Sequence, residues 1–225
     1  MRFDNPAFIG VLICWILSVG VHEFSHALAA YLGGDRSDQT KQYLKFNVFD
    51  YVHPVTTLLL PAIFLALGGI PLPGGAVYLN TAILSRNWQS IVSAAGPLSN
   101  FILFMLLALI VHPSVGLIDL YAPNPPVYVL VLSAMVFLEL FSVLINLVPI
   151  PPLDGFGIIE PWLTPESRMH ARAMGWIGVI FFFFVIWRLD WVQGWFISTT
   201  VNIMTAFGLP YEIIFDHFAV AMGFD

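Results

Sequence analysis

Apolar stretches of about the length that crosses the hydrocarbon core of a bilayer recur along this chain, at residues 7–32, 54–70, 91–111, 127–148, 173–186 and 191–207. Only short polar segments separate them. Charged residues make up 10% of the 225 positions, whereas they make up about a quarter of an ordinary soluble domain. The bilayer is therefore the expected solvent, and the chain has no room for a second soluble domain of any size.

These stretches predict an all-α polytopic membrane protein with five or six transmembrane helices. The count depends on residues 54–70, which prolines interrupt and which are short for a perpendicular span, so that they either span or re-enter. The glycines and prolines of residues 71–80 indicate a small re-entrant or β-like element before the next long helix.

We expect residues 1–225 to form a single integral membrane domain, with its core at about 7–163 and C-terminal helices at about 170–210. The formal net charge of −6 is spread over short connecting segments, without a basic block of the kind that binds nucleic acid. The lipid bilayer is thus the expected surrounding, and nucleic acid is not an expected partner. Lysines and arginines divide equally between alternate loops, so they do not decide the orientation in the membrane.

The first apolar stretch contains His22, Glu23 and His26, which match the motif H-E-x-x-H. The flanking residues 19–31 predict a helix, so both imidazoles lie on one face, one turn apart. Two nitrogen ligands then point at one spot, and Glu23 can take a proton from an attacking water as general base. The spacing is typical of zinc-assisted hydrolysis of an amide bond.

The alternative is that the motif arose by chance, or that these side chains only form hydrogen bonds within a helix bundle. Three ionisable side chains so close together in an apolar helix are costly unless they face a cavity, a partner or a metal. By helical rise, His22 lies roughly 15 Å from the end of the stretch. We therefore favour a metal site well below the membrane surface, which water must reach through a channel.

A catalytic zinc site usually has three protein ligands and one open position. The candidates for the third ligand are His53, His112, Glu139, Asp154, His170 and His217. Asp154 follows a proline-rich break beside apolar segments, which could present a carboxylate inward. Taken alone, the sequence Pro-Pro-Leu-Asp-Gly around it is equally compatible with an ordinary turn.

Three motifs, taken in order, resemble the site-2 protease family of intramembrane zinc metalloproteases. They are the HEFSH sequence at 22–26, AGPLSN at 95–100, which is similar to the Gly-Pro-x-x-Asn element of the family, and NLVPIPPLDG at 146–155. The likeness spans roughly residues 10–160 and is closest to the compact prokaryotic branch without a PDZ domain. Residues 74–80 depart from it, because they lack the lysine and prolines often found there.

The resemblance implies that His22, His26 and Asp154 bind one Zn²⁺ per chain and that Glu23 is the catalytic base. It also implies that Asn100 and Asn146 position substrate or stabilise the developing oxyanion. The expected substrate is a transmembrane protein or peptide, and the expected location is a prokaryotic inner membrane.

Two further residues are candidates for lining a cavity. Glu139 lies seven residues before Asn146, hence on a similar helix face, where it either lines a water path or forms a hydrogen bond between helices. His53 is either a gating residue or an ordinary loop histidine.

A different class of function also fits the composition. The chain could bind helices without cleaving them, or handle a metal for transport. Glu23 favours the enzyme, because a transport site has no evident need for a general base beside its ligands.

Overall fold

The computed structural model describes residues 4–51, 77 and 79–224, and every regular element within them is a helix. The elements are α1 (Pro6–Gly33), α2 (Asp38–Tyr43), η2 (Val48–Tyr51), η4 (Thr81–Ile83), α4 (Arg86–Val111), α5 (Val127–Asn146), α6 (Asp154–Ile159), η5 (Glu160–Trp162), α7 (Pro165–Arg188), α8 (Asp190–Ala206) and α9 (Tyr211–Met222). An all-α chain is thus confirmed for the described part. His53, residues 54–70 and nearly all of 71–80 lie outside it.

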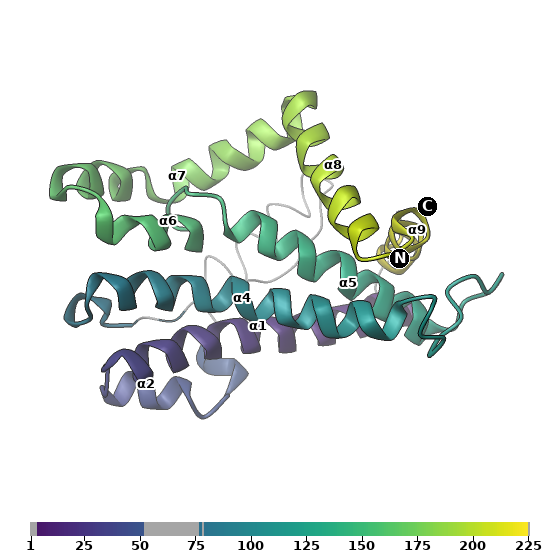
Figure 1. Cartoon of the computed structure of the whole chain (residues 1–225), viewed down its shortest axis with the longest axis horizontal. Coiled ribbons are helices and arrows are strands. Elements are labelled where there is room, and N and C mark those ends of the chain that lie inside the picture. The colour runs from purple at the N-terminus through teal and green to yellow at the C-terminus, as the bar shows by residue number, and fades with distance from the viewer. Residues whose placement is uncertain (1–3, 52–76, 78, 225) are drawn as a thin grey trace.

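Three of these helices, α1, α4 and α5, are long and apolar enough to cross a membrane, as judged over the described residues. They run side by side along the long axis of the molecule, with α4 antiparallel to its two neighbours (Figure 1). They correspond to the apolar stretches at 7–32, 91–111 and 127–148. The predicted stretches at 173–186 and 191–207 are also helical, within α7 and α8, so the described chain identifies three of the five or six expected spans.

Local sequence signals set the ends of the long helices. The side chain of Asn5 accepts a hydrogen bond from the Ala7 N–H, and Pro6 occupies the first turn of α1, where its missing N–H costs nothing. The helix ends at Gly34, whose φ of 119° is in the left-handed region. Ser85 caps α4 by accepting from the Trp88 N–H, so α4 begins five residues before the apolar stretch that predicted it.

α5 is the central helix of the bundle, since it packs against α1, α4 and α9. One apolar core joins α1, α5 and α9, and a second joins α4 and α5 to α8 and α9. The outward faces of α1 and α4 stay apolar and exposed at helical spacing, at Ile9, Ile13, Leu17, Leu98, Ile102, Leu106 and Leu109. Apolar faces that stay exposed among the described residues suit contact with lipid chains.

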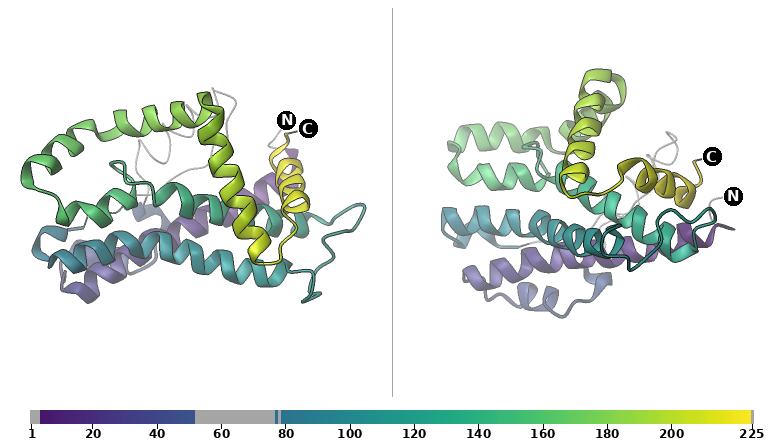
Figure 2. Two further views of the ribbon diagram at one scale, coloured as in Figure 1. Left: turned by 45° about the horizontal axis from the view of Figure 1, so that its top comes forward. Right: turned by 45° about the vertical axis from the view of Figure 1, so that its right-hand side comes forward.

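The C-terminal part forms an arm outside the three long helices. α7 bends at Gly175, which has φ 42° and ψ −132°, and α8 then returns toward α9 (Figure 2). α9 lies past the predicted C-terminal helices, and its 12 residues are too few to stand out as an apolar stretch. It brings the two ends of the chain together, because Asn5 Nδ2 donates to Val220 O at 3.0 Å.

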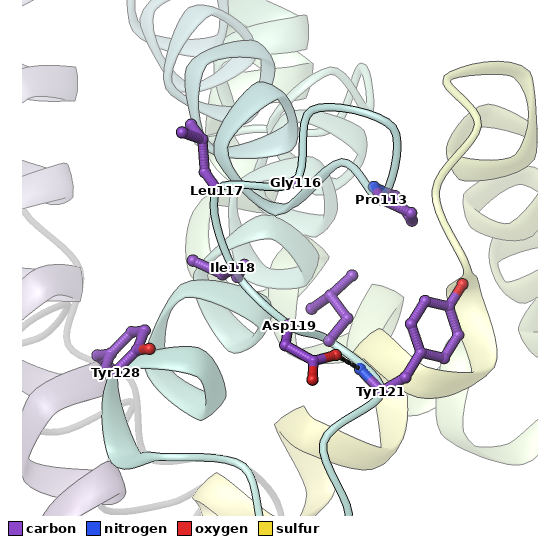
Figure 3. Close-up of a pocket in the computed structure, with 8 residues that line it drawn as sticks. Pro113, Gly116, Leu117, Ile118, Asp119, Tyr121 and Tyr128 are labelled. Atoms are coloured by element: carbon purple, nitrogen blue, oxygen red, sulfur yellow. Dashed lines mark hydrogen bonds between the residues drawn. The ribbon is translucent and has the colours of Figure 1, made fainter.

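The loop between α4 and α5 encloses a shallow hollow of about 350 Å³ (Figure 3). Apolar and tyrosine side chains line most of it, and Asp119 Oδ1 accepts from the Tyr121 N–H at 2.9 Å. The hollow lies at the end of α4 that is remote from α6 (Figure 1). It is therefore separate from the polar residues described next.

Candidate metal centre

Three side chains from distant parts of the sequence converge between α1, α4 and α6. His22 and His26 lie one turn apart on α1, and Asp154 is the first residue of α6. The two Nε2 atoms are 3.1 Å apart, and the Asp154 carboxylate lies 3.1 Å from Nε2 of His22 and 3.3 Å from that of His26. Both histidines are buried and Asp154 is nearly so, and the three form a group that could hold a metal ion.

The other ring nitrogen of each histidine has a partner that decides the tautomer. His26 Nδ1 lies 2.6 Å from the backbone oxygen of Val92 on α4. A carbonyl oxygen can only accept, so Nδ1 of His26 carries a hydrogen, and in the neutral ring Nε2 keeps its lone pair. Nδ1 of His22 contacts Oδ1 of Asn100, also on α4, with the same consequence. Both Nε2 atoms thus present lone pairs to one point.

This arrangement fits a bound zinc ion. In the neutral rings, the two Nε2 lone pairs lie 3.1 Å apart and repel each other, and a cation between them removes the repulsion. Asp154 Oδ2 is buried and has no hydrogen-bond partner among the described residues. A bound metal ion would supply the partner that this oxygen lacks. Zinc–nitrogen bonds of about 2.05 Å at the tetrahedral angle place two ligand atoms about 3.3 Å apart, close to the separations found.

Gly96 allows α4 to lie directly against the two histidines. A Cβ atom at this position would lie 2.5 Å from Nε2 of His22, and it would also collide with Nε2 of His26. Real Cβ atoms essentially never approach other heavy atoms within 3.0 Å. The glycine is therefore required by close packing at the site, a role that the motif analysis did not assign to it.

The proline-rich segment after α5 delivers Asp154 to the histidines. α6 begins at Asp154 and packs on α4, where Ser90 Oγ donates to the Ile158 carbonyl at 2.6 Å. Gly155 lies against the backbone of Leu147, where a Cβ would not fit. The carboxylate is therefore held by a compact turn that leads into a short helix.

Glu23 lies beside the ligand group without belonging to it. Its side chain is buried, and its carboxylate accepts a hydrogen bond from the backbone of Val77. The adjoining cluster contains Tyr43 and Tyr51, and Tyr51 Oη donates to the Tyr43 carbonyl at 2.7 Å. Burial, and secondarily the negative charge of Glu23, raises the pKa of Tyr51 to about 12, so this hydroxyl stays a neutral donor.

The remaining sequence candidates are in different surroundings. Glu139 is fully buried on α5 and accepts a hydrogen bond from Asn100 Nδ2 at 2.7 Å. Asn146 donates to Ser142 Oγ, one turn back in its own helix. Of the alternative third ligands, His112 accepts from the Ser114 N–H, His217 contacts Ser133 Oγ, and His170 lies on α7.

Sequence reasoning also missed the Val92 carbonyl, for a simple reason. Every residue carries a carbonyl, so no residue type signals which one meets a histidine. Gly96, in contrast, could have been found, because it opens the Gly-Pro-x-x-Asn element and lies four residues before Asn100 on the same helix face.

The model of peptidase family M50 matches residues 10–124, which are more than half of the chain. The chain belongs to peptidase family M50. This is the site-2 protease family, so the resemblance seen in the three motifs is confirmed. With three span-length apolar helices, this M50 chain is a membrane protein.

Three bacterial proteins are similar to this chain over most of its length. Rip2 of Mycolicibacterium smegmatis is 42% identical over 171 residues, which are 75% of this chain and 63% of that protein. Rip2 of Mycobacterium tuberculosis is 34% identical over 206 residues, 92% of this chain and 77% of that protein. YwhC of Bacillus subtilis is 29% identical over 193 residues, which are 80% of this chain and 84% of that protein. Each name provisionally describes a zinc metalloprotease.

The chain thus spans less than two thirds of the Mycolicibacterium protein. No solved structure matches the chain significantly. The family and the names of these relatives agree with the prediction of a zinc metalloendopeptidase, and His22, His26 and Asp154 form a group that could hold the metal ion of such an enzyme.

Proposed function

We propose that this chain is an intramembrane zinc metalloendopeptidase that hydrolyses peptide bonds within or near transmembrane segments of other membrane proteins. The observation that carries the proposal is the position of the ligand group. His22 and His26 lie about 16 Å and about 10 Å from the end of a helix long enough to cross the bilayer, with Glu23 between them.

The chain supplies the groups that such a hydrolysis needs. His22, His26 and Asp154 would hold the metal, each with its donor atom facing the others. When bound, zinc supplies a Lewis acid that polarises a peptide carbonyl and makes water easier to deprotonate. Glu23 takes a proton from the attacking water and returns it to the leaving nitrogen, so no other general base is needed.

The substrate class follows from the depth of the site. A peptide bond in an intact helix is shielded by its own hydrogen bonds, so a transmembrane substrate has to unwind locally before attack. We propose that residues 71–80, most of which lie outside the described part, hold an unwound segment by strand addition. Val77, which is described, donates a backbone hydrogen bond to Glu23. Because the described residues include three span-length helices and the relatives are bacterial proteins, we propose a multi-pass enzyme of a prokaryotic inner membrane.

The decisive experiment compares the purified protein with a Glu23→Gln variant and a His22→Ala variant. Zinc content and cleavage of a generic single-span substrate are measured for each. We expect about one zinc per chain and chelator-sensitive cleavage in the unmodified protein. Glu23→Gln should keep the zinc and abolish cleavage, because it removes the proton acceptor and leaves the ligands intact, whereas His22→Ala should lose both.

The competing functions give different results in the same experiment. A metal-handling protein would bind zinc but show no cleavage, and the Glu23→Gln variant would change nothing. A protein that only binds helices would bind the substrate without zinc. An unmodified protein that contains no zinc would refute the metallopeptidase.

A further inference from the structure

Glu139 is an ionisable residue buried completely in the middle of α5, the most enclosed of the long helices. A carboxyl group at membrane depth is costly and is retained where it has a function. Glu139 does not belong to the ligand group and is not placed to act on substrate, because no part of its side chain is exposed. Its contacts show what it does instead.

The carboxyl of Glu139 meets the side-chain amide of Asn100. Asn100 Nδ2 donates to Glu139 Oε2 at 2.7 Å and lies 3.2 Å from Ser18 Oγ. The other end of the same amide, Oδ1, contacts Nδ1 of His22. A continuous chain of hydrogen bonds therefore runs from α5 through α4 to a metal ligand on α1.

The chemistry of an amide gives this chain a direction. An asparagine side chain has one acceptor end and one donor end, and turning it over exchanges them. Because Glu139 offers an acceptor, the NH₂ group of Asn100 is held on that side and Oδ1 faces His22. His22 then carries its hydrogen on Nδ1, and its Nε2 lone pair faces His26 and Asp154.

We propose that Glu139 is a positioning residue of the metal centre, which acts through Asn100 to fix the tautomer and the ring orientation of His22. This inference rests on the proposed function. His26 needs no such help, because its Nδ1 donates to the Val92 backbone carbonyl, which cannot turn over. Of the two histidines, only His22 contacts a side-chain amide, that of Asn100, and this amide in turn donates to the buried carboxyl of Glu139.

The test uses Glu139→Leu and Glu139→Gln in the full-length protein. Zinc affinity is measured by competition with a chelator, and ligand geometry by the visible absorption spectrum of the cobalt-loaded protein. Loss of a group that orients a histidine ligand typically weakens metal binding by about 10- to 100-fold. We expect that loss and an altered cobalt spectrum for leucine, and near-normal values for glutamine, whose amide oxygen can still accept from Asn100.

A control on the same helix separates positioning from stability. Ser133 is also fully buried on α5 and bonds to His217 at 3.0 Å, apart from Asn100. Ser133→Ala should lower the unfolding temperature and leave both the zinc affinity and the cobalt spectrum unchanged. A parallel fall in zinc affinity for this variant would show that any defect in α5 weakens metal binding, and would overturn the proposal.

An exchange of the two groups gives a second, independent test. Asn100→Asp alone places two carboxyl groups against each other and should weaken zinc binding. Combined with Glu139→Gln, the donor and the acceptor change places, and zinc affinity should recover. If the leucine variant does not fold, this pair decides the question, since failure of the double variant to recover would refute the hydrogen-bond chain.

The outcomes also separate this proposal from the function on which it rests. An unmodified protein without zinc would remove both. If the unmodified protein binds zinc and Glu139→Leu binds it equally well with the same cobalt spectrum, the positioning role fails and the metallopeptidase stands.

Discussion

Replacing Gly96 by alanine is the smallest change that should disable the metal centre. The added Cβ would lie 2.5 Å from Nε2 and 2.6 Å from Cε1 of His22, inside the space where the histidine lone pairs meet. To reach even 3.0 Å, the His22 ring must retreat by about 0.5 Å and the His26 ring, whose Nε2 would lie closer still to the Cβ, by about 0.7 Å. Metal–ligand distances tolerate only about 0.2 Å.

The effect should fall mainly on metal binding. Without metal the imidazole can turn away from the new methyl group, whereas with metal bound it is held in place. Overpacking of a tight contact costs about 1–3 kcal/mol. If this cost destabilises the metal-bound state and not the metal-free state, zinc affinity falls by about 5- to 150-fold.

Chelator competition on the detergent-purified protein measures this directly, and Gly33→Ala is the matched control. Gly33 lies at the same α1–α4 contact, where a Cβ would lie 2.9 Å from the ring of Trp88. It is remote from the ligands, so this variant should lose stability and keep its zinc affinity. Unchanged zinc binding by the Gly96→Ala variant would refute the close approach of α4 to the histidines.

Three further results are expected. Asp154→Ala should lose bound zinc while its helical circular dichroism stays near normal, and retained zinc would exclude Asp154 as the third ligand. Chelator treatment should lower the unfolding temperature, and zinc at 100 times its Kd should restore about 2.7 kcal/mol of the free energy of unfolding. Neither treatment should change the stability of a His26→Ala variant. Burial alone would raise the pKa of Asp35, but hydrogen bonds from Thr40, Ser37 and Asn80 outweigh it and hold this pKa below its usual value. The stability that these bonds confer is therefore present above about pH 3.9 and is lost as the pH falls below that value. The difference in unfolding temperature between the unmodified protein and Asp35→Asn should close on acidification.

Much of this protein could be predicted from local sequence signals. Long apolar stretches predicted the helices now seen as α1, α4 and α5, because the bilayer accepts little else of that composition. The spacing of His22 and His26 predicted their convergence, since residues four apart share a helix face. Those inferences needed only the geometry of a single helix.

Other features depend on contacts between helices, which local sequence does not encode. The short helix α9 is held by its packing against α5 and α1 rather than by its own apolar length. From the sequence, Glu139 was compatible with a water path or a bond between helices. Its partner, Asn100, is 39 residues away, so only the packing of α5 on α4 brought the two together.

The sequence by itself determined the membrane setting, the long helices, the His-Glu-x-x-His motif on α1 and the family. Each of these follows from composition or from residues close together in the chain. The tertiary structure decided that Asp154 reaches both histidines, that Gly96 makes room for them, and that Val92 and Asn100 set their tautomers. The physical reason is that a ligand geometry is a set of distances between separate helices, and those distances are fixed only when the helices pack.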